Sequence, residues 1–199
     1  MPKQFKFFIN NQLNFQCRLQ SEQCTAMKPN GLQCRNRTVI GTNICWTHLL
    51  YRDHLRILDT PHGKGLFAKN PRKAPNAVIF SRAQRIISYG GQIIDLWDLN
   101  RRYGKKTAPY GVDIGNNEYE DGACLRGIGS IANHASGDRA NARFGFTRGG
   151  ELFLYADRPI RNGQEILIDY NRGGREMGDN RRQYRLHEKA VRHETMNVA

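Results

Sequence analysis

The sequence predicts a mainly β fold with short helices and a small N-terminal zinc module. Short apolar runs of strand length recur after residue 50, and Gly, Asn and Pro turn signals separate them. Four of the five cysteines precede residue 50, which marks a boundary. The length of 199 residues suits one packed domain with a small appendage. We therefore expect a zinc-binding module over 1–50, a β-rich domain over 51–171 and a basic tail over 172–199.

The first fifty residues contain a metal-ligand pattern. They are rich in Asn, Gln and Lys, and they carry too few large apolar side chains to close a core alone. The pattern C-x9-C-x10-C-x2-H consists of Cys24, Cys34, Cys45 and His48. Thiolate and imidazole ligands suit tetrahedral zinc, and the last two can reach one ion from a single turn. We expect a closed structural site whose metal supplies folding free energy that the small core cannot.

The two other cysteines leave an alternative open. An odd number of cysteines disfavours a complete disulfide framework, and clustered thiols in a core-poor segment more often bind metal in a reducing compartment. Cys17 is an alternative ligand, most easily in place of Cys24, whereas Cys124 lies in no nucleophile motif. The stretch from QCTA to CWTHL also resembles a short zinc-binding module that accompanies other domains.

Strands are predicted in the domain over 51–171 wherever apolar residues form short runs between turns. These runs are 54–58, 77–80, 85–88, 111–114, 142–146, 152–155 and 166–170. The apolar spacing over 94–103 predicts a short helix, and a second helix is predicted over 179–193 in the tail. Helices do not alternate with the strands, so a βαβ architecture is not expected.

The charge of the chain points to a polyanionic partner. The 31 Lys and Arg against 18 Asp and Glu give a net charge of +13, and residues 1–50 and 171–199 carry more than half of it. Such a balance favours contact with nucleic acid, nucleosomes or acidic protein, although a merely solvated basic surface is an equal alternative. No apolar run reaches the roughly 18 residues of a membrane helix, so we expect a soluble intracellular protein without membrane contact.

Four segments of the larger domain combine glycines, an Asn-His pair and two tyrosines. They read GKGLFA at 63–68, ISYGGQI at 87–93, IANHAS at 131–136 with NA at 141–142, and GQEILIDY at 163–170. One Gly-rich turn alone is weak evidence, and no predicted helix follows it, which excludes a dinucleotide-binding interpretation. Taken together, in this order and at these separations, the segments resemble the SET domain of protein-lysine methyltransferases.

The resemblance covers about residues 55–171 and implies the SET fold, in which small curved sheets surround a knot-like crossing of the Asn-His segment under a loop. The sequence departs from the family pattern at three points. Gln92 stands in place of a Glu, and Ser130 in place of an Arg. The stretch between Asn133 and Asn141 is longer by about two residues than in that pattern.

The resemblance implies methyl transfer from S-adenosylmethionine to a lysine, an in-line displacement that requires a neutral amine. Because an ammonium has a pKa of about 10.4, a narrow channel between aromatic rings helps to remove its proton. Tyr170 is the first choice as the catalytic tyrosine, with Tyr89 in support. Tyr110 is assigned to the channel wall, although a position in the core is an equal alternative. The resemblance assigns the cofactor to Gly63, Lys64, Gly65, Tyr89, Asn133, His134 and Tyr170.

The implied substrate is a lysine of a histone or of another chromatin- or nucleic-acid-associated protein, which favours the nucleus, chromatin or a viral factory. No cysteine-rich segment follows the last motif, so the tail 172–199 or a second copy of the chain in a homodimer is expected to cover the site. The alternative function is a catalytically inactive SET-like module that binds nucleic acid or chromatin. The departures from the pattern favour this alternative, whereas the intact tyrosines and Asn-His pair weigh against it.

Overall fold

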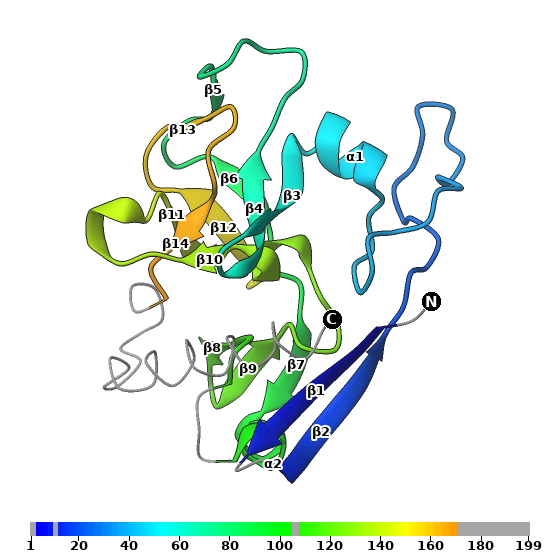
Figure 1. The fold of residues 1–199 in the computed structure, drawn as a ribbon, viewed down its shortest axis with the longest axis vertical. Helices are drawn as coiled ribbons and strands as arrows, with labels where there is room; N and C mark the ends of the chain where they lie inside the picture. The colour runs from blue at the N-terminus through cyan, green and yellow to red at the C-terminus, as the bar shows by residue number, and fades with distance from the viewer. Residues whose placement is uncertain (1–2, 10–11, 105–107, 171–199) are drawn as a thin grey trace.

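The computed structural model describes residues 3–9, 12–104 and 108–170 of the 199-residue chain. This part forms five small sheets joined by short helices (Figure 1), which confirms the predicted mainly β fold. Neither α-helix of this part has the length and apolar character that a membrane crossing requires. The predicted helix over 179–193 lies outside the described residues.

The largest sheet has the strand order β10-β14-β11-β12-β6. Its strands are Asn133–His134, Leu167–Ile168, Ala142–Phe146, Leu152–Ala156 and Arg85–Ser88. A three-stranded sheet has the order β7-β9-β8. Its strands are Gln92–Asp95, Glu118–Asp121 and Gly111–Gly115. The chain passes directly from the first sheet to the second, because Tyr89, Gly90 and Gly91 connect β6 to β7.

Three two-stranded sheets surround these two. They pair β1 (Lys3–Ile9) with β2 (Gln12–Leu19), β3 (Leu55–Thr60) with β4 (Gly63–Ala68), and β5 (Val78–Phe80) with β13 (Ile160–Arg161). The helices are α1 (Trp46–Tyr51), α2 (Leu96–Tyr103) and the 3-10 turns η1 (Ile128–Ile131) and η2 (Gly137–Arg139).

A crossing of the chain lies near the β10 edge of the five-stranded sheet. Strand β14 runs parallel to both of its neighbours, and it pairs Leu167 with Asn133 of β10 and Ile168 with Ala142 of β11. The connection from β10 to β11 therefore bridges over the inserted strand. The crossing lies at the Asn-His segment, as the resemblance implies, but the inserted strand is β14, and Asn133 and His134 form its neighbour β10.

Several predicted elements differ in detail from those observed. The GKGLFA segment is a strand, β4, and not only a turn, because it pairs with β3 along its whole length. Helix α2 begins at Leu96, two residues later than predicted, because Ile94 and Asp95 complete β7. The Asp95 side chain then accepts a hydrogen bond from the Asp98 backbone N–H and caps the helix.

The β1-β2 hairpin was not predicted, and it packs on a core that it shares with the larger domain. Figure 1 shows the hairpin beside α2 and the three-stranded sheet. The Phe7 and Phe15 rings meet the fully buried Tyr103 ring of α2 edge-on, at centroid distances of 4.9 and 5.0 Å. Phe5 meets Tyr110 in the same way at 5.6 Å. The hairpin thus obtains from α2 and Tyr110 the core that its own composition cannot provide.

A disulfide between Cys17 of β2 and Cys124 ties this hairpin to the loop before η1. The two cysteines are separated by 107 residues in the sequence, and their Cα atoms are 5.5 Å apart. The alternative in which Cys17 replaces Cys24 as a metal ligand is therefore wrong. Sequence spacing could not reveal the pairing, because it depends on how the hairpin docks.

Because the disulfide closes a long loop, we expect the Cys17→Ser/Cys124→Ser double variant to lose about 2–4 kcal/mol of unfolding free energy. Denaturant unfolding followed by circular dichroism measures the loss. A reductant should lower the stability of the unmodified protein to that of the double variant and leave the double variant unchanged. Equal stability of the two proteins without reductant would contradict the disulfide.

Candidate functional site

Cys24, Cys34, Cys45 and His48 come together into one candidate metal site, as the sequence predicts. Their ligand atoms all lie within 4.8 Å of one another, and the three cysteines are buried. His48 Nδ1 lies 3.6 Å from Cys24 Sγ and 3.3 Å from Cys45 Sγ. Ligands of a tetrahedral ion with bonds of about 2.0–2.3 Å are separated by roughly 3.3–3.8 Å, so both His48 distances match this geometry and the four side chains are close enough to converge on one ion.

Hydrogen bonds reach all three thiol groups of this site, but only the Cys45 thiol has a lowered pKa, whereas burial raises the pKa of Cys24. Backbone N–H groups of Cys45 and Asn36 donate to Cys24 Sγ and Cys34 Sγ, and the Asn36 amide donates to Cys45 Sγ. Burial raises the pKa of the Cys45 thiol, but hydrogen bonds from His48 and Asn36 outweigh it and lower this pKa to about 6. A thiol that ionises near neutral pH is ready to bind a metal cation.

A second site forms around the chain crossing, where β10 meets the β3-β4 hairpin. Asn133 Nδ2 donates to Glu165 Oε1 at 2.8 Å and lies 3.3 Å from Thr60 Oγ1. Gly65 faces the same group, and a Cβ atom there would lie 2.4 Å from Glu165 Oε1 and 3.0 Å from Asn133 Nδ2. The Asn133 amide is therefore fixed in orientation against a stretch of bare backbone.

Asn141 fixes the segment that follows Glu165 through side-chain and backbone hydrogen bonds. Its side-chain N–H donates to the Glu165 carbonyl at 2.8 Å, and its side-chain oxygen accepts from the Leu167 N–H at 2.9 Å. The Asn141 backbone N–H also donates to the Leu167 carbonyl at 2.9 Å. Since Asn141 is 7% exposed, both ends of a buried amide are satisfied by the inserted strand.

His134 and Tyr170 lie against each other at the end of β14. The Tyr170 backbone N–H donates to His134 Nδ1 at 3.1 Å, and the two ring centroids are 5.2 Å apart. His134 Nε2 lies 3.0 Å from the Ser136 hydroxyl. Because both ring nitrogens of His134 lie within hydrogen-bond distance of neighbouring residues, this side chain stabilises the local structure of the site.

Tyr89 and Tyr170 approach the same aromatic ring from different segments. The Phe144 ring packs against both, with centroid distances of 5.7 Å to Tyr89 and 6.4 Å to Tyr170. The Tyr89 hydroxyl donates to the Tyr110 carbonyl at 2.7 Å, and the Tyr170 hydroxyl donates to the Ala132 carbonyl at 2.6 Å. Burial, followed by the nearby Tyr170, raises the pKa of Tyr89 well above its usual value, so this phenol stays protonated.

Close backbone packing aims Tyr89 into this cluster. A Cβ atom at Gly127 would lie 1.9 Å from the Tyr89 carbonyl oxygen, and one at Gly129 would lie 2.9 Å from the Tyr89 Cα. The glycines before and within η1 therefore let β6 and the 3-10 turn meet backbone to backbone. This explains a run of glycines to which the sequence assigns no role.

Tyr110 contributes its backbone to the tyrosine cluster, and its ring packs on the hairpin core. The ring meets Phe5, and the Arg126 guanidinium carbon lies 4.9 Å from the ring centroid.

Gly63 and Lys64 form the start of β4, where the Thr60 hydroxyl donates to the Gly63 carbonyl. The exposed Lys64 ammonium pairs with Asp59.

Sequence reasoning missed three residues of this site: Thr60, Glu165 and Phe144. Glu165 lies inside the GQEILIDY segment, so its position was a usable signal. Thr60 and Phe144 carry no such signal, because each reaches the site through the pairing of its own strand.

The sequence profile of the SET domain matches residues 63–171, which is more than half of the chain. The chain therefore belongs to the SET-domain family. No curated protein matches it.

Similar solved structures come from polycomb repressive complex 2. One is ctPRC2 in an autoinhibited conformation bound to S-adenosylmethionine, with TM-score 0.48, 19% identity and coverage of 58% of this chain and 15% of that chain. Another is polycomb repressive complex 2 of Chaetomium thermophilum, with TM-score 0.49, 21% identity and coverage of 63% and 15%. A third is ctPRC2 in complex with H3K27me3 and H3K27M, with TM-score 0.49, 21% identity and coverage of 63% and 14%. The chain thus matches only a small part of those proteins.

The close approach at Gly65 predicts that Gly65→Ala destabilises the protein by about 1–3 kcal/mol, because the new methyl group displaces Glu165 and the Asn133 amide. Gly149→Ala is the matched control, since the nearest atom to a Cβ there is Thr147 Oγ1 at 3.7 Å. Thermal unfolding of both variants measures the difference. Equal melting temperatures would show that the backbone at Gly65 is not closely packed.

Proposed function

We propose that the chain is an S-adenosylmethionine-dependent protein-lysine N-methyltransferase. The observation that carries the proposal is the meeting of Asn133 and His134 with Tyr170, and through Phe144 with Tyr89, at the chain crossing. Apart from Phe144 on β11, these residues come from three distant segments, and each matches its position in the SET pattern.

The cofactor side of the proposed site consists of the β4 glycines and β10. Asn133 and His134 are half-buried, so a ligand can reach them. Gly65 presents backbone without a side chain beside Asn133, which suits close contact with a small molecule. When bound there, S-adenosylmethionine supplies an activated methyl group on a positively charged sulfur. Gly63, Lys64, Gly65, Asn133 and His134 would hold it.

The lysine side of the proposed site consists of tyrosine hydroxyls. Tyr89 and Tyr170 both donate their hydrogens to backbone carbonyls, so each hydroxyl would meet a substrate amine with its oxygen as an acceptor. A substrate amine can donate to such oxygens and present its own lone pair to the methyl group. The buried ring of Phe144 keeps the surroundings poorly hydrated, which favours the neutral amine over the ammonium. Alignment of the amine then lowers the barrier.

We expect Tyr170→Phe to lower methyl transfer by about 100-fold or more, because the substrate amine loses an acceptor that the Ala132 carbonyl orients. Mass spectrometry of a histone pool incubated with S-adenosylmethionine measures the transfer. Tyr119→Phe is the matched control, since Tyr119 lies half-buried on β9 outside the tyrosine cluster. A Tyr170→Phe variant as active as the unmodified protein would contradict the assignment.

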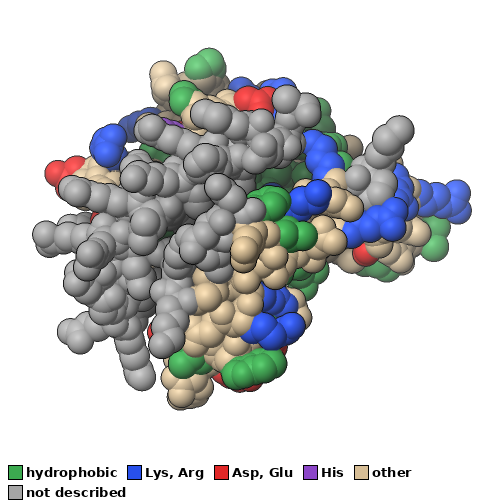
Figure 2. All heavy atoms as spheres, turned by 60° about the horizontal axis from the view of Figure 1, so that its bottom comes forward, with side chains coloured by type: hydrophobic (Ala, Val, Ile, Leu, Met, Phe, Trp, Pro, Cys, Tyr) green, Lys and Arg blue, Asp and Glu red, His purple; other side chains and the backbone are tan. Residues whose placement is uncertain are grey.

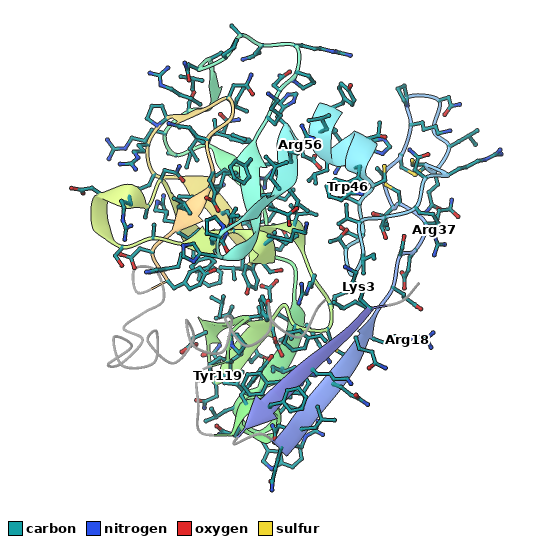
Figure 3. All side chains as sticks on the ribbon, in the orientation of Figure 1. Lys3, Arg18, Arg37, Trp46, Arg56 and Tyr119 are labelled. Carbon is teal, nitrogen blue, oxygen red and sulfur yellow. A yellow bond between two sulfur atoms is a disulfide. The ribbon has the colours of Figure 1, made fainter. Side chains whose placement is uncertain are left out.

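A catalytically inactive module that binds nucleic acid is the second candidate, and exposed cations favour it. Lys3, Arg18 and Arg37 lie along one side of the N-terminal segment (Figure 3), and Lys and Arg side chains gather on this side of the surface (Figure 2). The same cations suit an active enzyme that reaches a histone through nucleic acid. Calorimetry with S-adenosylmethionine separates the two candidates. Absence of both cofactor binding and methyl transfer would leave only the binding module.

We propose zinc as the metal of the Cys24, Cys34, Cys45 and His48 site. Metal analysis of protein purified without chelator should give about one zinc per chain, and Cys34→Ser should abolish it. The variant should also unfold at lower temperature, because metal binding contributes folding free energy to a segment with a small core. Cys124→Ser is the control, since Cys124 lies in the disulfide and should leave the zinc content unchanged. A metal-free protein with unchanged stability would contradict the proposal.

A further inference from the structure

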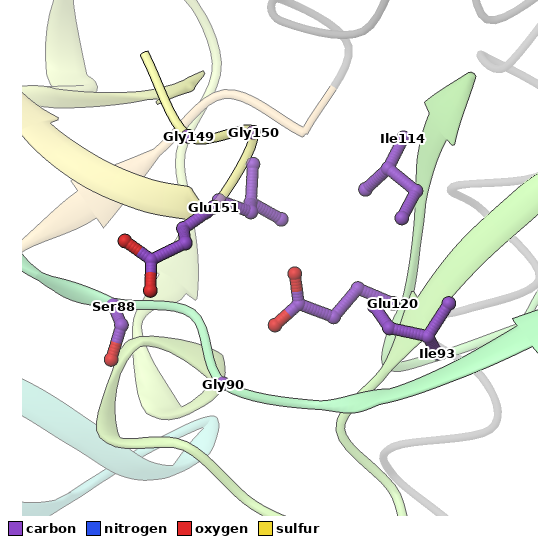
Figure 4. Close-up of a pocket in the computed structure, with 9 residues that line it drawn as sticks. Ser88, Gly90, Ile93, Ile114, Glu120, Gly149, Gly150 and Glu151 are labelled. Carbon is purple, nitrogen blue, oxygen red and sulfur yellow. The ribbon is translucent and has the colours of Figure 1, made fainter. Parts of the chain in front are cut away.

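A cavity of about 390 Å³ lies between the two larger sheets, next to the tyrosine cluster. Its lining comes from the end of β6, from β7, β8 and β9, and from the β11-β12 turn (Figure 4). The lining residues are Ser88, Gly90, Ile93, Ile114, Glu120, Gly149, Gly150, Glu151 and Leu152.

Two carboxylates face this cavity. Figure 4 shows the Glu120 carboxylate pointing from β9 towards Glu151 and Ser88. Glu120 is only 8% exposed, and its Oε1 accepts a hydrogen bond from the Gly91 N–H at 2.7 Å. Glu151 is exposed at the rim. The cavity therefore has one buried and one exposed acidic group in its lining.

Neither carboxylate has a cationic partner among the described residues. The ion pairs of this part of the chain all involve aspartates, and none includes Glu120 or Glu151. The neighbouring Asp121, fully buried, shows the contrast, because Arg102 pairs with it at 2.7 Å. Burial raises the pKa of Glu120, although backbone hydrogen bonds from Gly91 and Gly90 offset part of this effect. A buried acidic group that opens into a cavity without such a partner favours a cationic ligand.

The other walls suit the aliphatic part of a long side chain. Ile93 and Ile114 lie across the cavity from Glu151 (Figure 4), and Leu152 adds apolar surface. Lysine and arginine combine an aliphatic stem with a terminal charge, so both match a cavity with apolar walls and acidic groups.

The cavity also lies where a peptide would pass. Ser88 and Gly90, which flank Tyr89 in the chain, both line it. On the opposite side, Glu120 pairs with Val112 in a strand that begins directly after Tyr110. The cavity therefore lies beside the chain segments that carry Tyr89 and Tyr110, at a distance that a residue close to the target lysine of a bound peptide can span.

We infer that this cavity binds the cationic side chain of a second substrate residue, an arginine or a lysine close to the target lysine. The inference rests on the proposed function, and it explains how a chain of net charge +13 can select a basic protein segment. Complementary local charge decides which residue enters, while the overall charge acts on a polyanionic partner.

The test is nuclear magnetic resonance of the ¹⁵N-labelled full chain, titrated with the tripeptide Ac-Ala-Arg-Ala-NH₂ and its lysine and citrulline counterparts. The amides of Gly90, Gly91, Gly149 and Gly150 report on the cavity walls. We expect the arginine or lysine peptide to shift these signals and the neutral citrulline peptide to leave them unchanged. Glu120→Gln and Glu151→Gln should each weaken binding by about five-fold or more. Glu118→Gln, an exposed change on the same strand outside the cavity, should have no effect.

The same variants are then assayed for methyl transfer to a lysine-centred peptide library with randomised flanks. Preference for a basic flank should weaken in Glu120→Gln and Glu151→Gln. Absent glycine shifts, equal shifts with citrulline, or unchanged binding by both cavity variants would overturn the inference. Charge-dependent shifts without methyl transfer to any peptide would leave the cavity assignment standing and count against the proposed function alone. The amide spectrum of each variant shows whether it has folded.

Discussion

The insertion of β14 between β10 and β11 positions the proposed active site. Asn141 holds the inserted strand through both ends of its buried side-chain amide, and the Ala135 N–H adds a hydrogen bond to the Ile168 carbonyl at 3.0 Å. Loss of one such partner leaves a buried polar group unsatisfied, which costs about 1–3 kcal/mol. Because Glu165 and Tyr170 flank this strand while Asn133 and His134 pair with it, the same hydrogen bonds that stabilise the crossing also set the distances within the site.

Backbone carbonyls orient both candidate catalytic hydroxyls. Tyr89 donates to the Tyr110 carbonyl, and Tyr170 donates to the Ala132 carbonyl. The chain crossing and the close backbone contact at Gly127 bring these segments together. A backbone acceptor cannot rotate away as a side chain can, so each phenol is preorganised before a substrate arrives. The raised pKa keeps the Tyr89 phenol protonated, so this hydroxyl can position a substrate amine without taking a proton from it.

The N-terminal fifty residues gain stability in two different ways. The hairpin packs on Tyr103 and Tyr110 of the larger domain and is tied to it by the disulfide, whereas the following loops converge on the four side chains of the candidate metal site, where a bound metal would add stability.

Two neighbouring carboxylates of β9, Glu120 and Asp121, have different surroundings. Asp121 is buried with Arg102 and accepts from the Tyr103 hydroxyl, which stabilises the base of α2, while Glu120 faces a cavity instead. Adjacent carboxylates on one strand thus serve stability and recognition because their side chains point to opposite faces.

The amino-acid sequence alone was sufficient to predict the mainly β class, the four residues of the candidate metal site and the segments that carry the SET pattern. These features depend on local spacing: Cys45 and His48 lie three residues apart on one turn, and the seven predicted strands are short segments rich in apolar residues between turn signals. Contacts between distant segments could not be obtained in this way. The Cys17–Cys124 bond, the hairpin core on Tyr103, the Phe144 ring against two tyrosines and the cavity at Glu120 each join residues far apart in the chain. Their geometry depends on strand register and on the crossing, which only the folded chain determines.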